Sequence, residues 1–280
     1  MWNRIIEGDC IREMAALPQG IAQVVIADPP YFGISGAEWD NQWSNEADYV
    51  LWSEKWVAEA MRLLRDDGLA FIFGQPGKRQ HVFLHVVSSL CRRHAFHDLL
   101  IWDRVVGYNE RRDSFTPCYE MILVLRKSVR PKFRKDAVRV PYDPEVIARY
   151  LRDRRYKDRL ARLRHLEAGK FATNLLRMPS LKGNSREKCG HPTQKPVALI
   201  QRLIASASDC GDLVLDPFLG SGTTAEAAAR LGRAWLGIER HGHYAAMARG
   251  RMTAALRELH AATKNPPAPH GHRRAAKGAD

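Results

Sequence analysis

Two short motifs carry side chains that could do chemistry, one near each end of the chain. The first is Asp28-Pro29-Pro30-Tyr31, and the second is Asp216-Pro217-Phe218-Leu219-Gly220-Ser221-Gly222-Thr223-Thr224. Each motif follows a short apolar run, so each is expected at the carboxyl end of a buried strand. Open α/β sheets bind their ligands at that edge. The two motifs are therefore expected to form one composite ligand site.

The first motif has the properties of a clamp for an exocyclic amine. Proline fixes its own φ and favours an extended conformation in the preceding residue, so the Asp28 carboxylate and the Pro29 carbonyl can be held toward one point. Two fixed acceptors can take both N–H bonds of an aromatic amine and draw its lone pair toward an electrophile. Tyr31 could then stack on the base. The alternative interpretation is a strand that ends at Pro-Pro beside a core tyrosine.

The second motif combines a strand end, a Gly-Ser-Gly turn and a helix start, a geometry that suits a nucleoside. Glycine lets the backbone pass close to a ligand, and Glu239, after the next strand, can accept hydrogen bonds from ribose hydroxyls. The chain lacks the G-x-x-x-x-G-K-S/T pattern of a triphosphate site, and Phe218 puts an apolar ring where a pyrophosphate binder needs small residues. A glycine turn alone is weak evidence, but a nucleoside cofactor with an uncharged or cationic link fits better than a dinucleotide.

The elements that must position these motifs alternate between strand and helix, the pattern of a parallel sheet flanked by helices. Two apolar runs in the middle, residues 99–102 and 121–125, are joined by a polar loop and could form an antiparallel edge of that sheet. The other expected strands are residues 22–27, 69–73, 213–215 and 234–238, and the expected helices are residues 49–64, 77–90, 196–207, 223–231 and 243–262.

Composition limits the domain count and indicates a polyanionic partner. With 280 residues, 45% of them hydrophobic, the chain can build one α/β domain with an insert. The net charge is +13, and residues 126–164 hold fifteen Lys and Arg against five Asp and Glu, a local net of +10. A basic chain can simply be well solvated, but charge concentrated in one segment favours nucleic acid as the partner.

The charged segment lies in a stretch that breaks the alternation of strands and helices. We predict a catalytic half at residues 1–128, an insert at 129–190, a cofactor-binding half at 191–262 and a disordered basic tail at 263–280. Within the insert, the spacing predicts one long Arg-rich helix over residues 144–166.

Cysteine usage and hydropathy indicate a reduced, cytoplasmic protein. The five cysteines form no C-x-x-C pair, and the amino terminus lacks the layout of a signal peptide. Cys189 with His191 is too sparse to predict a zinc site, so no metal is expected. No apolar run approaches the roughly 20 residues that span a bilayer, so no membrane association is expected.

Three motifs together resemble the β-class amino-methyltransferases of DNA, which use S-adenosylmethionine. These are D-P-P-Y at residues 28–31, T-Q-K-P at 193–196 and D-P-F-L-G-S-G-T-T at 216–224. They agree with that family in identity, order and spacing, and the resemblance runs from about Glu7 to Arg251. It implies a mostly parallel, Rossmann-like methyltransferase sheet, circularly permuted so that the catalytic half comes first, with a target-recognition region between the halves.

The resemblance also implies roles for individual residues. Asp28, Pro29, Pro30 and Tyr31 would be catalytic. The expected cofactor-binding residues are Asp9, Cys10, Asp28, Lys195, Asp216, Phe218, Gly220, Ser221, Gly222, Thr223 and Glu239, with Gln194 as a further candidate. Within this set, Asp9 and Cys10 would lie near adenine, Lys195 near the methionine part and Glu239 on the ribose.

The expected activity is methyl transfer from S-adenosylmethionine to the N6 amine of an adenine flipped out of double-stranded DNA. The aspartate at position 28 resembles the adenine-N6 members, since cytosine-N4 members usually have serine there. Cytosine-N4 methylation is the nearest alternative, and RNA methylation or a non-catalytic DNA-binding protein on the same scaffold are further ones. The resemblance also allows a homodimer and a paired restriction enzyme. In the loop between the apolar runs at residues 99–102 and 121–125, Arg104, Asn109, Arg111 and Arg112 could contact DNA or simply be exposed.

Overall fold

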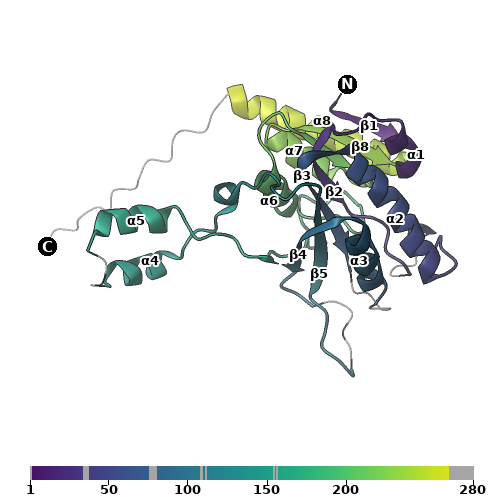
Figure 1. The fold of residues 1–280 in the computed structure, drawn as a ribbon. Helices are drawn as coiled ribbons and strands as arrows, with labels where there is room; N and C mark the ends of the chain where they lie inside the picture. The colour runs from purple at the N-terminus through teal and green to yellow at the C-terminus, as the bar shows by residue number, and fades with distance from the viewer. Residues whose placement is uncertain are drawn as a thin grey trace.

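The fold is built around an eight-stranded mixed sheet with strand order β1-β8-β7-β2-β3-β5-β4-β6 (Figure 1). It is seen in a computed structural model that describes residues 2–33, 38–75, 81–107, 110, 112–153, 155 and 157–264. The strands are β1 Arg4–Glu7, β2 Ala22–Ala27, β3 Leu64–Gly74, β4 Ala95–Asp103, β5 Tyr119–Arg126, β6 Leu175–Arg177, β7 Leu213–Asp216 and β8 Ala234–Glu239. The helices are α1 Cys10–Ala15, α2 Glu46–Leu63, α3 Val82–Arg93, α4 Pro144–Leu151, α5 Arg159–Glu167, α6 Val197–Ala207, α7 Thr223–Arg230 and α8 Gly242–Lys264.

Helices cover both faces of the sheet, and this explains why β2 is apolar throughout most of its length. All six residues of β2 are buried. Successive side chains point to opposite faces, so Val25 and Ala27 pack with α1, α2 and α3, whereas Val24 and Ile26 pack with α6, α7 and α8. A strand buried on both faces has no reason to alternate apolar and polar residues.

The predicted α/β fold is confirmed, including the antiparallel pair. β5 pairs antiparallel with both β3 and β4, while the other pairings in the sheet are parallel. β5 lies inside the sheet because β4 and then β6 extend it further. Residues 4–7, 10–15 and 175–177 form β1, α1 and β6, which are too short to show a period in the sequence.

The prediction of one long helix over residues 144–166 is wrong. The segment forms α4 and α5, and Asp158 begins the second helix by accepting a hydrogen bond from the Ala161 N–H at 2.9 Å. The guanidinium of Arg162 stacks over the ring of Tyr150, 5.2 Å from its centroid, and links the two helices. Figure 1 shows this pair apart from the sheet, at the end of the segment that joins β5 to β6, which we call the arm.

The two ends of the insert lie against the sheet. Lys132 forms ion pairs with Asp209 at 3.2 Å and Asp212 at 2.9 Å, and β6 pairs with β4 through residues 101–103. The expected basic tail begins inside α8, which ends at Lys264, and residues 265–280 lie outside the described part of the chain, as do residues 77–80 of an expected helix. Among the described helices, none is both long and apolar enough to cross a bilayer.

Candidate active site

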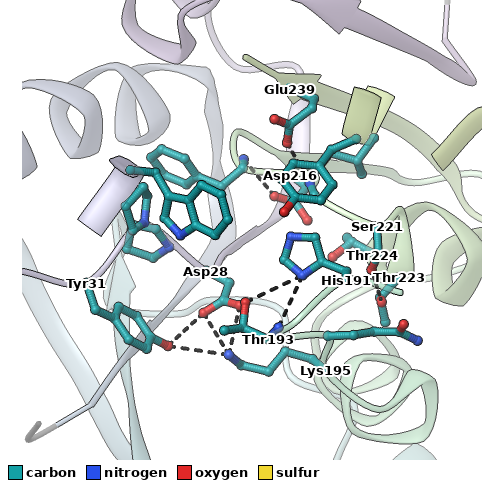
Figure 2. Close-up of a pocket in the computed structure, with 18 of the residues that line it drawn as sticks. Asp28, Tyr31, His191, Thr193, Lys195, Asp216, Ser221, Thr223, Thr224 and Glu239 are labelled. Atoms are coloured by element: carbon teal, nitrogen blue, oxygen red, sulfur yellow. Dashed lines mark hydrogen bonds and ion pairs between the residues drawn. The ribbon is translucent and has the colours of Figure 1, made fainter. Parts of the chain in front are cut away.

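The two motifs meet because their strands are neighbours. β2 and β7 pair in parallel, with Val24 opposite Val214 and Val25 opposite Leu215, so the segments that follow them leave the same edge of the sheet side by side. A cavity of about 380 Å³ opens there, lined by residues of both motifs together with Lys195 and Glu239 (Figure 2). The sequence prediction that they form one site agrees with this geometry.

Asp28 lies at the centre of a hydrogen-bonded group in this cavity. Its Oδ1 accepts the Tyr31 hydroxyl at 2.7 Å, and the Lys195 Nζ donates to Oδ1 at 2.9 Å and to Oδ2 at 2.8 Å. Figure 2 shows the three side chains converging from the segment after β2 and the segment before α6. The carboxylate is therefore held in one orientation by two donor side chains.

The backbone of the first motif is held by its surroundings. The Tyr49 hydroxyl donates to the Pro30 carbonyl at 2.9 Å, and the Asp40 Oδ1 accepts the Tyr31 N–H at 2.8 Å. With two prolines restricting φ, these bonds leave the segment little freedom to move. Tyr31 meets Asp28 through its hydroxyl, which fixes the position of the ring that we expected to stack on a base.

Burial and charge set the protonation of this group. Burial alone would lower the pKa of Lys195, but the Asp28 and Glu120 carboxylates outweigh it, so the pKa is raised and the ammonium stays charged. Burial and the same two carboxylates raise the pKa of Tyr31 well above its ordinary value. The site thus presents a neutral phenol and a cationic amine to Asp28 at neutral pH.

Sequence reasoning missed Glu120 of β5. Its Oε2 lies 3.2 Å from the Lys195 Nζ, and its Oε1 accepts from an Arg104 guanidinium nitrogen at 3.2 Å. The signal in the sequence was a carboxylate inside an otherwise apolar buried strand, where charged residues are rare unless paired. Arg104 was considered as a DNA contact, but it lines the cavity and pairs with Glu120. Asn109 and Arg111 lie outside the described residues.

Glu239 fixes the glycine turn of the second motif. Its Oε2 accepts the Gly220 N–H at 2.8 Å and its Oε1 accepts the His241 N–H at 2.8 Å. Gly220 and Gly222 have φ values of 51° and 82°, a region that favours glycine, and a Cβ on Gly222 would approach the Ala248 Cβ to 3.0 Å. Gly222 shapes the turn, whereas Gly220, Ser221 and Thr223 line the cavity.

Asp216 is a buried acid that lines the same cavity. Burial, reinforced by the Asp28 and Glu239 carboxylates, raises its pKa to about 7, although the Thr224 side chain and the Phe218 N–H donate to it and oppose the rise. An acid in this setting is about half protonated at neutral pH. A nearby cation would favour its ionised form.

The other expected cofactor residues also line the cavity. Asp9 does so while it caps α1, accepting from the N–H groups of Ile11 and Arg12 at 3.1 Å, and the buried Cys10 follows it. Phe218 lines the cavity and packs edge-on against Trp56, with ring centroids 5.0 Å apart. Gln194 also reaches the cavity, but its amide holds the backbone at Glu187 and Cys189.

An aromatic wall lines the cavity, and the sequence did not lead us to expect His191 and Tyr244 in it. The His191 ring lies 4.5 Å from Tyr244, and Trp39 lies 5.7 Å from Tyr244 in an edge-on arrangement. All three line the cavity, and burial lowers the pKa of His191 so that its ring is neutral at pH 7. A neutral aromatic surface of this kind suits a flat heterocycle.

The residues present fit a nucleoside that carries a positive charge. Asp216 is buried and has no cationic hydrogen-bond partner in the described part of the chain. Glu239 ends β8 beside the turn, and a Cβ on Gly220 would come within 3.2 Å of the His191 Nε2. A ligand at this turn would therefore lie close to the backbone and next to two carboxyl groups. Within the described residues, no group of three His, Cys, Asp or Glu side chains could hold a metal.

Comparison with known proteins agrees with this geometry. The family model described as DNA methylase, for the N6/N4 methyltransferases, matches residues 22–250. The DNA adenine methyltransferase YhdJ of Escherichia coli is 30% identical over 256 residues, covering 90% of this chain and 83% of YhdJ.

Solved structures share the fold. The putative DNA modification methylase TTHA0409 of Thermus thermophilus, in complex with S-adenosylmethionine, gives a TM-score of 0.59 at 22% identity, over 90% of this chain and 95% of that one. The cytosine-N4-specific PvuII DNA methyltransferase gives 0.67 at 18% identity, over 92% and 96%. The family model, which matches residues 22–250, establishes that the chain belongs to the N6/N4 DNA methylase family and is an S-adenosylmethionine-dependent DNA methyltransferase.

Proposed function

We propose that this enzyme methylates the N6 amine of adenine in double-stranded DNA. The observation that carries the proposal is the rigid carboxylate of Asp28 beside Pro29, in a cavity that both motifs line. The aspartate at the first position of the motif supports adenine over cytosine. The 30% identity to a relative named as a DNA adenine methyltransferase supports the same choice.

The proposed mechanism rests on acceptors placed before the substrate arrives. Asp28 and the Pro29 carbonyl accept the two N–H bonds of the target amine, which localises the nitrogen lone pair and stabilises the positive charge that develops on it. Bound S-adenosylmethionine supplies an activated methyl group on a sulfonium. The remaining contribution of the protein is orientation, because both Asp28 and the backbone of Pro30 are held by hydrogen bonds.

Asp216 and Glu239 are proposed to hold the cofactor, Glu239 through the ribose hydroxyls and Asp216 near its positive charge. Cys10 and Asp9 border the same cavity and are proposed for the adenine end. Lys195 touches Asp28, so its proposed position lies between the cofactor and the target base.

The raised pKa of Asp216 leads to a prediction about cofactor binding. Before the cofactor binds, Asp216 is mostly protonated below pH 7, and a bound cation must displace this proton, so S-adenosylmethionine affinity should rise by about tenfold between pH 6 and pH 8. Isothermal titration calorimetry at both pH values measures this. The Asp216→Asn variant should lose this rise, while any titration of the cofactor itself remains in both proteins. An equal pH dependence in the two proteins would contradict the assignment.

The arm is proposed to bind the DNA backbone. Arg152, Arg159 and Arg164 lie on or beside α4 and α5, in the most basic segment of the chain. Replacing all three with glutamine should weaken DNA binding and reduce the slope of log K against log salt by about 0.9 for each phosphate that the arm no longer neutralises. Fluorescence anisotropy over a salt series measures both. The control is Arg92→Gln, which changes an exposed arginine at the end of α3. An equal salt slope for the triple variant and this control would rule out the arm as a DNA-binding element.

The test of the base assignment can be made in cells. The gene is expressed in a bacterial host that lacks DNA methyltransferases, and the genomic DNA is sequenced by a single-molecule method that distinguishes N6-methyladenine from N4-methylcytosine. The proposal expects N6-methyladenine in one short sequence context, absent when Asp28→Ala is expressed. Detection of N4-methylcytosine instead would agree with the family and show that the proposed target base is wrong.

A further inference from the structure

Glu120 lies outside the motifs, yet it is the second carboxylate, after Asp28, that contacts Lys195 and Tyr31. It lies on β5, between the register pairs Asp103–Tyr119 and Ile101–Met121, so strand pairing fixes its backbone. Its side chain is 7% exposed and lines the cavity. A buried carboxylate is costly unless cations pair with it, and here Lys195 and Arg104 both do.

The acceptor capacity of Asp28 is nearly filled in the structure. An ionised carboxylate offers about four lone-pair positions. The Tyr31 hydroxyl takes one on Oδ1 at 2.7 Å, and the Lys195 ammonium takes one on each oxygen at 2.9 Å and 2.8 Å. An incoming amine therefore competes with donors that already hold Asp28.

Glu120 is within reach of these same two donors. Its Oε2 lies 3.3 Å from the Tyr31 hydroxyl and 3.2 Å from the Lys195 Nζ. A phenol has one proton and donates to one carboxylate at a time, and the shorter distance places that proton on the Asp28 side. A small rotation of the hydroxyl, with a small shift of the ammonium, would transfer both bonds to Glu120.

Arg104 keeps Glu120 in place for this role. Its guanidinium bonds the other carboxylate oxygen, Oε1, at 3.2 Å and leaves Oε2 facing Tyr31 and Lys195. The two carboxylates and two cations of this group balance in charge. Moving the hydrogen bonds of Tyr31 and Lys195 from one carboxylate to the other changes no charge in the buried site.

We propose that Glu120 is a positioning residue that takes over the hydrogen bonds of Tyr31 and Lys195 when the target amine binds Asp28. The proposal rests on the proposed function, in which Asp28 accepts that amine. It adds a step that the motifs do not contain: Asp28 is held by Tyr31 and Lys195 before the target base binds, and a second acceptor releases it for the substrate.

The test is the isosteric variant Glu120→Gln, which removes the charge and keeps the shape. With its charge gone, this side chain holds Tyr31 and Lys195 less well, so kcat for methyl transfer should fall by about 10- to 100-fold while KM for DNA and cofactor change little. In this variant, Asp28 is the one carboxylate of the group that still pairs with Lys195. Arg104 nearby is positive, and Tyr31 and His191 are neutral, so the Lys195 ammonium loses its proton more easily than in the wild type. The ratio of variant to wild-type kcat should therefore rise as the pH is raised above neutral, since a neutral lysine releases Asp28.

Asp212→Asn is the matched control, because Asp212 is also a largely buried carboxylate with two cation partners, Lys132 and Arg65, but lies at the opposite end of β7. This control should keep wild-type kcat. The proposal is overturned if Glu120→Gln retains kcat within twofold of wild type, or if its loss is independent of pH and shared by Asp212→Asn. If Asp28→Ala loses methylation while Glu120→Gln is fully active, only the role of Glu120 is rejected. If the wild type methylates no adenine, the proposed function is rejected.

Discussion

Asp28→Ala is expected to lower kcat for methyl transfer by about 10²- to 10⁴-fold, the range found when a positioned acid–base or charge-stabilising group is removed. The alanine leaves the amine with the Pro29 carbonyl alone and removes the charge that stabilises the developing positive nitrogen. Cofactor and DNA affinities should stay close to those of wild type, because neither ligand depends mainly on this carboxylate. Single-turnover kinetics with a labelled methyl group separate this effect on chemistry from any effect on binding.

Asp209→Ala serves as the control for a lost aspartate, since Asp209 lies in the turn before β7 and pairs with Lys132 and Arg134, away from the cavity. Thermal unfolding of both variants shows whether the buried Lys195 is tolerated when Asp28 is missing. Retention of more than a tenth of the wild-type kcat in Asp28→Ala would contradict the clamp.

Glu239→Ala is expected to weaken S-adenosylmethionine binding by about 10- to 100-fold, the equivalent of one or two hydrogen bonds to a charged group. Two effects combine. The Gly220 and His241 N–H groups lose their acceptors, each at 2.8 Å, so the glycine turn is held less firmly. The remaining lone pairs of the carboxylate, proposed for the ribose hydroxyls, are removed as well.

Calorimetry measures the cofactor affinity, and anisotropy measures the affinity for DNA without cofactor, which should be unchanged. Glu239→Gln is the matched variant, because it keeps one acceptor oxygen and should lose less affinity than the alanine. Equal cofactor affinity in Glu239→Ala and wild type would remove Glu239 from the binding site.

The parts of the fold that could be predicted are those in which local pattern and tertiary environment agree. β2 was predicted with its observed bounds because six buried residues stand between polar turns. β7, the glycine turn and α7 followed for the same reason, since a strand, a turn that needs positive φ and a helix start are all encoded locally. The meeting of the two motifs was predictable because parallel strands end at one edge of the sheet.

What the sequence did not predict depends on partners far along the chain. Glu120 gains its significance from Lys195 and Arg104, which no spacing in β5 reveals. Residues 144–166 were expected to form one helix, but the cap at Asp158 begins a second one and the contact of Arg162 with Tyr150 joins α5 to α4. β6 has three residues and forms because β4 offers it an edge.

The base that accepts the methyl group can be identified with purified protein, DNA of mixed sequence from a methylation-free source, and S-adenosylmethionine with a deuterated methyl group. After digestion, mass spectrometry of the nucleosides identifies the base that carries the label. Labelled N6-methyladenine is expected with the wild type and none with Asp28→Ala. Labelled N4-methylcytosine, or labelled adenine from both proteins, would contradict this expectation.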